Sequence, residues 1–473
     1  MTALQSTRQE KDFLGVRNLD NTLYYGVQTL RAKENFHLSG RRIGEYAEFV
    51  KALALVKHAA ANANYRIGLL DAAKHAAIAK ACAEVIDGAL HDEFVVDMIQ
   101  GGAGTSSNMN VNEVLANRAL EHLGQEKGDY RHLHPNNDIN MSQSTNDAYP
   151  SAIRVGLLLA HLPLLESLSH LATTLASKAE QFDTILKMGR TQLQDAVPMT
   201  LGQEFRAMAD TVSADLEQLH TLIPAALCAV NLGGTAIGTG INADPRYQAI
   251  AIEELAALSG FPIRSAANLI AATSDMGDFV LLSGLIKKTA LRLSKISNDL
   301  RLLSSGPRAG LGELNLPPRQ PGSSIMPGKV NPVIPEAVNQ VAYEIAGNDA
   351  ALTLAAEAGQ LQLNAMEPLI AYKLFDSIRL LDRAVRMLDR ECIAGITANP
   401  DRCSALVQRS IGIVTALNPY IGYENATRIA RLAQETGRTV VELVQSERLI
   451  SSELLAEILR PENMVAPRAV ARA

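Results

Sequence analysis

The sequence predicts an all-α fold: a long central helical bundle with smaller helical domains before and after it. Of the 473 residues, 47% are hydrophobic but only 4% are aromatic and none is Trp, so Ala, Leu, Ile and Val must build the core. Helix–helix packing suits that composition best. Two further observations are long apolar patterns at helical spacing after about residue 147, and a loop rich in Pro and Gly between them.

The first predicted domain covers residues 1–146. Length alone suggests about three domains of ~150 residues each. This part of the chain mixes helical patterns with polar stretches rich in Gly and Asn, at residues 101–110 and 132–146. We expect these stretches to be ordered loops that carry function.

The second predicted domain, residues 147–399, holds the long helices. The clearest pattern alternates steps of four and three residues, as on the buried seam of a bundle helix: Leu282, Ile286, Thr289, Leu293, Ile296, Leu300 and Leu303. A second pattern, which Pro163 should bend, consists of Leu158, Leu162, Leu165, Leu168, Ala172, Leu175 and Ala179. Some faces of these helices carry little charge, which suggests that they are buried against other subunits.

A long loop and a third domain complete the predicted organisation. The segment from Leu311 to Pro332 cannot be helical throughout, because prolines recur at positions 317, 318, 321, 327 and 332. Long loops of this kind are usually functional or disordered. The pair Asn399-Pro400 predicts the next boundary, and residues 400–473 are expected to form a small domain of short helices.

Charge and cysteine usage exclude several classes of protein. The formal net charge is −6, and Lys and Arg are scattered rather than gathered in a stripe, which argues against nucleic-acid binding. The first residues show no basic-then-apolar signal segment, and apolar runs such as residues 155–160 are interrupted by His161, Pro163 and Glu166, so no transmembrane helix is expected. We expect a reduced, cytoplasmic protein, because no CxxC pair is formed by Cys82, Cys228, Cys392 and Cys403.

The most informative part of the loop reads Gly322-Ser-Ser-Ile-Met-Pro-Gly-Lys-Val-Asn-Pro332. Its glycines give a mobile backbone, its serines supply hydroxyls, and Lys329 and Asn331 supply a cation and an amide. These groups are suited to binding an anion. The alternative is a solvated surface turn, but such a turn has no need for the apolar Ile325 and Met326 beside them.

This segment resembles the signature of the fumarase/aspartase superfamily, and the resemblance extends over nearly the whole chain. The aspartase branch in particular is matched by Tyr24-Tyr-Gly-Val-Gln-Thr-Leu-Arg31, Gly101-Gly-Ala-Gly-Thr-Ser106, Gln143-Ser-Thr-Asn-Asp-Ala148, Gly189-Arg-Thr-Gln-Leu-Gln-Asp-Ala-Val-Pro198 and Ala358-Gly-Gln-Leu-Gln-Leu-Asn364. The resemblance implies an all-helical fold, a homotetramer and active sites that are each shared by three chains. It also implies deamination of L-aspartate to fumarate and ammonia through an enediolate.

The same matching assigns roles to individual residues. Ser323 would remove a proton from the carbon next to a carboxylate, and Asn146 would hold the amine. The β-carboxylate would be held by Thr105, Ser144, Thr145 and Ser324, and the α-carboxylate by Thr191, Lys329 and Asn331. Gln192 follows Thr191 in the same motif and is expected to line the substrate site.

The chemistry demands such donors, because removing a proton from Cβ of aspartate places a second negative charge on an already anionic carboxylate. A neutral serine is a weak base, so Ser323 would need its alkoxide stabilised by loop N–H groups, by Lys329 and by exclusion of water. Seen alone, residues 144–147 could equally be a helix N-cap before an apolar run or part of a substrate site. The surrounding motifs favour the substrate site.

Position 192 separates the branches of the superfamily. The fumarase pattern has His there, backed by a glutamate that matches Glu336, whereas this chain has Gln192. An ammonium can leave as ammonia without an added proton, but hydroxide needs an acid, which glutamine cannot supply. Deamination is favoured over the alternatives, a class II fumarate hydratase and a lyase of an N-substituted aspartate. A further alternative is a non-catalytic structural protein on the same fold, as some lens crystallins are.

Other motifs predict no cofactor and no metal. The segment Gly233-Gly-Thr-Ala-Ile-Gly238 is faintly similar to a dinucleotide fingerprint, but no strand is expected before it. His132 and His134 lack a third ligand nearby and are better explained as solvated loop histidines. For Arg31 and Arg190, a role in a structural ion pair is at least as good an explanation as contact with the substrate.

Overall fold

The computed structural model describes residues 7–467, and its chain divides into two compact units. The first unit contains the described residues up to Leu165, together with Glu217–Ala290 and Tyr343–Asp382. The second unit contains Glu166–Leu216, Leu291–Ala342 and the described residues from Arg383 onward. The three domains with boundaries at residues 146 and 399 stay a prediction, because the units group residues by contact and not by order in the sequence.

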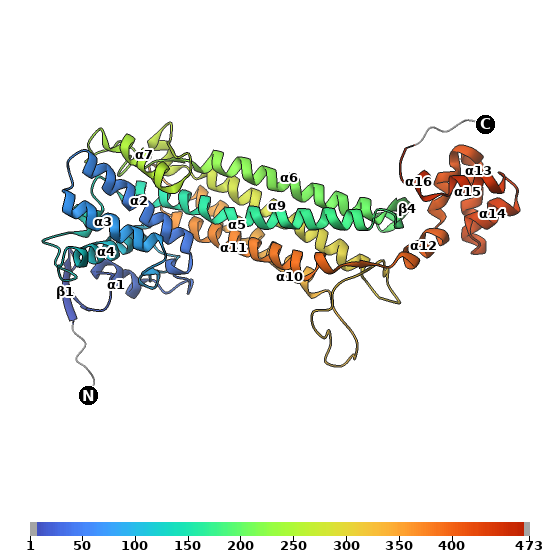
Figure 1. Cartoon of the computed structure of the whole chain (residues 1–473), viewed down its shortest axis with the longest axis horizontal. Helices are drawn as coiled ribbons and strands as arrows, with labels where there is room; N and C mark the ends of the chain where they lie inside the picture. The colour runs from blue at the N-terminus through green and yellow to red at the C-terminus, as the bar shows by residue number, and fades with distance from the viewer. Residues whose placement is uncertain (1–6, 468–473) are drawn as a thin grey trace. The chain divides into compact units, whose positions relative to one another are not determined.

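Five long helices confirm the predicted all-α class (Figure 1). Each contains residues of both units. They are α5 (Thr145–Gln181), α6 (Leu201–Leu227), α9 (Gly277–Leu303), α10 (Val333–Glu357) and α11 (Glu367–Glu391). Side chains join neighbours within a unit: Ser283 of α9 donates to Asp349 of α10 at 2.7 Å, and Asn348 of α10 donates to Ser377 of α11 at 3.2 Å.

The first unit also contains shorter helices and two small sheets. Its helices are α1 (Val27–Asn35), α2 (Ala47–Arg66), α3 (Ala72–Ile86), α4 (Thr105–His122), α7 (Tyr247–Ser259) and α8 (Leu269–Ser274). Strands β1 (Thr7–Asp12) and β2 (Gly15–Asp20) pair antiparallel, and β5 (Ala229–Val230) pairs parallel with β6 (Arg264–Ser265). Helix α2 packs against α3, α4 and α7. Because α2 is rich in Ala, neighbouring helices can approach it closely on several sides.

The predicted seam of α9 is confirmed, since every one of its seven residues is buried. The stripe of α5 is wrong in part. Leu162 is 47% exposed and Leu165 is only half-buried, whereas Leu164, outside the predicted stripe, is fully buried. Before Leu168 the prediction placed the three- and four-residue steps in the wrong order. Positions 162 and 165 therefore lie to one side of the face that packs against the core.

Helix α5 continues through His161, Pro163 and Glu166, the residues that interrupt its apolar run. Among the described residues, α5 is the one helix whose length and composition would allow it to cross a membrane. However, 56% of its most apolar stretch is buried inside the structure, as in the core helix of a folded domain.

The second unit adds strands that the sequence did not predict. Strand β3 (Leu186–Thr191) pairs with β4 (Gln194–Thr200), and β7 (Leu314–Asn315) pairs with β8 (Thr397–Ala398), both antiparallel. The remaining helices are α12 (Pro400–Arg409), α13 (Val414–Thr436), α14 (Val440–Ser446), α15 (Ser452–Ile458) and α16 (Pro461–Met464). Helix α12 begins directly after Asn399, and the domain boundary predicted there stays a prediction. Met188 of β3 packs into the core of α12 to α15, which anchors the hairpin.

Candidate active site

A cavity of about 370 Å³ opens in the first unit at the beginning of α5. It lies within the range of small-molecule sites, ~300–1,000 Å³. The groups that line it are amides, hydroxyls and apolar side chains: Asn140, Ser142, Gln143, Ser144, Thr145, Thr235, Ala236, Ile241 and Asn242. A wall of neutral donors suits an anionic ligand, since it offers hydrogen bonds without a charge that repels it.

Ser144 and Thr145 are both cap residues and cavity residues. The Ser144 hydroxyl accepts the Asn146 N–H at 3.3 Å, and the Asp147 carboxylate accepts the Ser144 N–H at 2.8 Å. The N-cap explanation is therefore confirmed. It does not compete with substrate binding, because a helix N-terminus favours a bound anion through its free N–H groups and dipole.

Asn146 has a fixed orientation. Its Nδ2 donates to the Ala236 carbonyl at 2.8 Å, and its own carbonyl accepts from Asn231 at 2.9 Å. One Nδ2 hydrogen is engaged, so Asn146 offers a ligand its Oδ1 and the second Nδ2 hydrogen. Its Oδ1 can accept a hydrogen bond from an ammonium.

Asp147 holds the opposite wall of the cavity. Its carboxylate is fully buried and accepts the N–H groups of Gly233 at 2.9 Å and Thr235 at 3.0 Å. Burial raises the pKa of Asp147 to about 6, although those N–H groups pull it down. The Gly-rich segment 233–238 is thus a cavity wall. The expectation that no strand precedes it is wrong, since β5 does, but α7 begins only at Tyr247 and no helix follows directly as a dinucleotide site requires.

Sequence reasoning missed Lys57, a buried cation behind this cavity. Its Nζ donates to Asn108 at 2.7 Å and to Asn140 and Gln143 at 2.9 Å each. Burial lowers the pKa of Lys57 to about 7, although Asp147 pulls it up. One signal was available: Lys57 is a single cation inside an apolar, Ala-rich helical run.

Thr105 begins α4 and is exposed. Its hydroxyl donates to the Gly102 carbonyl at 2.8 Å, so it must turn away from the backbone to serve a ligand. Gly104 precedes it with φ +87°, and a Cβ there would come within 2.4 Å of the Tyr149 ring. One turn further on, Asn108 donates to Thr145 at 3.2 Å, which joins the first turns of α4 and α5.

Thr191 and Gln192 lie at the tip of the β3–β4 hairpin in the second unit, and both are exposed. Gln192 and Leu193 have φ of 54° and 62°, which is typical of a two-residue hairpin turn. The base of the hairpin is fixed by the fully buried Glu313, which pairs with Arg190 at 2.7 Å and Lys187 at 3.1 Å. The ion-pair interpretation of Arg190 is confirmed.

Arg31 forms the corresponding ion pair in the first unit, with Asp12 at 2.7 Å, which confirms its ion-pair interpretation too.

The loop after Glu313 is closed by its own hydrogen bonds. Gly322 N–H donates to the Lys329 carbonyl at 2.7 Å, and Asn331 Nδ2 donates to the Gly322 carbonyl at 2.8 Å. The Ser323 Oγ accepts two N–H groups, from Ile325 at 3.2 Å and Met326 at 3.0 Å. Ser324 and Lys329 are exposed at the loop surface.

The structure therefore gathers the predicted residues into two groups. Thr105, Ser144, Thr145 and Asn146 belong to the first unit, and the second unit holds Thr191, Gln192, Ser323, Ser324, Lys329 and Asn331. Within the second unit, no hydrogen bond among the described residues joins the hairpin tip to the loop segment 322–331.

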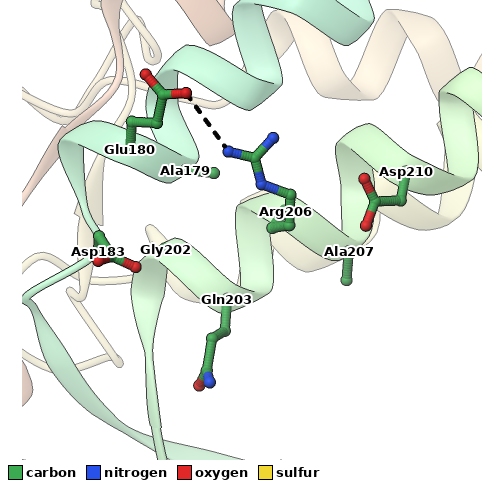
Figure 2. Close-up of a pocket in the computed structure, with 8 residues that line it drawn as sticks. All are labelled: Ala179, Glu180, Asp183, Gly202, Gln203, Arg206, Ala207 and Asp210. Atoms are coloured by element: carbon green, nitrogen blue, oxygen red, sulfur yellow. Dashed lines mark ion pairs between the residues drawn. The ribbon is translucent and has the colours of Figure 1, made fainter. Parts of the chain in front are cut away.

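A larger cavity of about 550 Å³ lies elsewhere in the second unit, between the end of α5 and the start of α6. Figure 2 shows Arg206 reaching toward Glu180, with an ion pair of 3.7 Å. No predicted site residue lines this cavity. Its three carboxylates, Glu180, Asp183 and Asp210, would repel a dicarboxylate, so we place the candidate site at the smaller cavity.

The histidines of the loop before α5 have structural partners. His134 caps the turn at residues 135–139, because its Nδ1 accepts the N–H groups of Asn136 and Asn137 at 3.0 and 3.3 Å. His132 is exposed, as expected. Between residues 7 and 467, no group of three or more His, Cys, Asp or Glu side chains is placed to hold a metal ion.

The chain is similar to known lyases in sequence and in structure. A family model described as Lyase matches residues 18–347, and one described as Fumarase C C-terminus matches residues 413–466. The chain is 68% identical to the aspartate ammonia-lyase of Pseudomonas canavaninivorans, over 99% of each chain. The cobalt-bound fumarate lyase:delta crystallin of Brucella melitensis aligns with a TM-score of 0.95 and 54% identity, over 98% of this chain and 100% of that chain. The class II fumarase of Schistosoma mansoni aligns with a TM-score of 0.93 and 34% identity, over the same shares.

Proposed function

The chain belongs to the aspartase/fumarase superfamily of lyases, and we propose that it acts there as an aspartate ammonia-lyase, converting L-aspartate reversibly into fumarate and ammonia. The observation that carries this proposal is the cavity wall at the beginning of α5. Ser144 and Thr145 line the cavity and offer hydroxyl donors to a carboxylate. The next residue, Asn146, is proposed to accept from the ammonium through its amide oxygen. In aspartate the ammonium nitrogen and the β-carboxylate carbon are three bonds apart, so neighbouring residues can bind both groups.

Ser323 is the proposed base. It would take a proton from Cβ of aspartate, which makes the β-carboxylate an enediolate with a second negative charge. Its Oγ already accepts two loop N–H groups, and these would stabilise an alkoxide in the same way that an oxyanion hole stabilises an oxyanion. Closure of the loop, which excludes water, would strengthen that effect.

The remaining residues would bind the two carboxylates. Thr105, Ser144, Thr145 and Ser324 are proposed for the β-carboxylate, where charge accumulates, and Thr191, Lys329 and Asn331 for the α-carboxylate. Lys329 supplies a charge and three donors to that carboxylate. Asn331 keeps one Nδ2 hydrogen for it after closing the loop.

Gln192 favours the amine as leaving group. The ammonium carries its own protons away, whereas hydroxide would need an acid that an amide side chain cannot provide. A class II fumarate hydratase remains the alternative to test, because the Schistosoma mansoni enzyme shares the fold and a third of the sequence. A lyase of an N-substituted aspartate is the second alternative.

We also propose a homotetramer with active sites shared by three chains, in the cytoplasm. Large apolar side chains are exposed along two long helices, where a second copy could cover them: Leu281, Leu291 and Leu302 on α9, and Tyr343 and Leu354 on α10. Their steps of ten and eleven residues keep them on one side of each helix.

The proposal is tested by the ultraviolet absorbance of fumarate when the purified protein meets L-aspartate, L-malate or argininosuccinate. A rapid rise is expected with aspartate alone. Comparable rates on aspartate and malate would indicate a hydratase, because they would require an acid at the leaving group. A faster rise with argininosuccinate would indicate a pocket for a larger amine.

A further inference from the structure

Three amide side chains around Lys57 are all oriented by one cation. When Lys57 is protonated, its Nζ has three hydrogens and accepts nothing, and the three go to the oxygens of Asn108, Asn140 and Gln143. Lys57 is 1% exposed, and among the described residues it has no carboxylate at ion-pair distance. The titratable groups that face it are Asp147 of α5 and Cys82 of α3.

The orientation of the Asn108 amide determines whether the Thr145 hydroxyl accepts or donates a hydrogen bond. Because the Asn108 oxygen faces Lys57, its Nδ2 must face the other way, and it donates to Thr145 Oγ1 at 3.2 Å and to Asn140 Oδ1, itself bound by Lys57, at 3.1 Å. A threonine hydroxyl that accepts a hydrogen bond keeps its proton for another acceptor. Thr145 lines the cavity, so that proton is available to a ligand carboxylate.

We infer that Lys57 is a positioning residue for the lyase reaction: through Asn108 it forces the Thr145 hydroxyl to donate into the cavity rather than to accept from it. The inference rests on the proposed function, in which Thr145 holds the carboxylate that becomes an enediolate. Without the cation, the Asn108 amide could turn over and place its oxygen on Thr145. The Thr145 hydroxyl would then donate its proton to the Asn108 oxygen, and the substrate carboxylate would lose a hydrogen-bond donor.

The chain offers a variant that reverses this link while keeping the volume of the side chain. Asn108→Asp gives Lys57 a carboxylate partner, which supports the fold, but both carboxylate oxygens can only accept, so Thr145 must donate to Asp. The matched control is Asn117→Asp, on the same helix. Asn117 is also fully buried and donates to the Tyr24 carbonyl at 2.8 Å, outside the cavity.

The experiment measures turnover of saturating L-aspartate by the full-length variants, with folding followed by circular dichroism and thermal unfolding. Thr145→Ala, Asn108→Asp and Lys57→Met are each expected to lower kcat by about 10²–10³-fold, the loss typical of one oxyanion donor. Added to Thr145→Ala, either of the other two should lower kcat by less than about threefold more, because the donor is already gone. Asn117→Asp should keep kcat within about threefold of the unaltered protein.

Three results would overturn the inference. One is near-normal kcat in folded Asn108→Asp, and another is losses that multiply in the double variants, as independent structural damage would give. The third is failure of both Asn108→Asp and Lys57→Met to fold, which would make the network part of the fold only. An unaltered protein without activity on aspartate, or an active Thr145→Ala, would instead contradict the proposed function and site.

Discussion

Residues at the start of α5 serve the fold and the candidate site with the same atoms. Ser144 caps the helix and lines the cavity, so a pattern typical of an N-cap could not distinguish the two roles. The sequence predicted Ser144 and Thr145 of this wall, because they belong to one motif that is continuous in the chain. It did not predict Lys57, Asn108 or Asn140, since their contacts join α2, α4 and the loop before α5, and no spacing within one segment reveals such contacts.

The charge state of Lys57 gives a prediction for stability. Burial lowers its pKa from 10.5 to about 7, so between these pH values the unfolded chain binds more protons than the folded one. The free energy of unfolding should therefore rise with pH in this window, by on the order of 1 kcal/mol per pH unit. Asp147, with its pKa raised from 3.8 to about 6, acts in a separate window at lower pH and in the opposite direction.

The measurement is denaturant unfolding between about pH 7 and about pH 10, for the unaltered protein and for Lys57→Met. The variant should lose this rise with pH. Lys74→Met is the control, because Lys74 pairs with Asp138 at 2.8 Å and is partly exposed, and it should keep the rise. Equal pH dependence in the unaltered protein and Lys57→Met would show that Lys57 is protonated in the folded state throughout the window.

Among the elements, long helices were predictable and short strands were not. The α9 seam was predicted because its seven positions follow one helical period over about six turns. The α5 stripe failed where three- and four-residue steps can be ordered in two ways. The β3–β4 hairpin has an exposed tip, and its strand pairing depends on Met188 and on Glu313, which lies far along the chain. Local propensity carries no information about either contact.

Glu313 holds the base of the β3–β4 hairpin and precedes the loop segment 322–331, which gives a prediction at this scale. Glu313→Gln removes the charge partner of the partly buried Arg190 and leaves the buried Lys187 paired with Glu204 alone, and removing one member of a buried ion pair costs about 3–5 kcal/mol. The expected result is a lower free energy of unfolding, measured with denaturant, and a lower kcat, because both Thr191 and the loop lose their fixed base.

Glu391→Gln is the matched control. Glu391 pairs with Arg319 of the same unit at 2.7 Å, but its side chain is 46% exposed. Exposed pairs contribute about 0–1 kcal/mol, so this variant should remain within about 1 kcal/mol of the unaltered protein. Equal losses in the two variants would contradict the anchoring role of Glu313.

For the whole molecule, the proposed residues come from segments that long helices separate along the chain. Thr191 precedes α6, and Ser323 precedes α10. If a homotetramer assembles each site from three chains, Ser323→Ala and Thr191→Ala variants can complement each other. Refolding an equal mixture of the two should restore about a quarter of the sites, because random assembly pairs an intact Thr191 with an intact Ser323 that often.

The complementation is measured as fumarate formation by the refolded mixture, with each variant refolded alone as the control. Activity equal to the sum of the two separate variants would mean that Thr191 and Ser323 serve the same chain's site. Neither composition nor helical periodicity could decide this point, because the surfaces that would join copies depend on tertiary structure. The sequence predicted active sites shared between chains only through the resemblance to the superfamily.

The most direct test of the central claim, that Ser323 removes the Cβ proton of L-aspartate, is the turnover of Ser323→Ala on that substrate. Ser305→Ala is the control, since Ser305 lies earlier in the same connection and accepts the Leu311 N–H at 3.1 Å. The account predicts that Ser323→Ala folds normally, keeps much of its affinity for aspartate and loses several orders of magnitude in kcat, while Ser305→Ala stays active. Near-normal kcat in Ser323→Ala would contradict the account, because another group would then be the base.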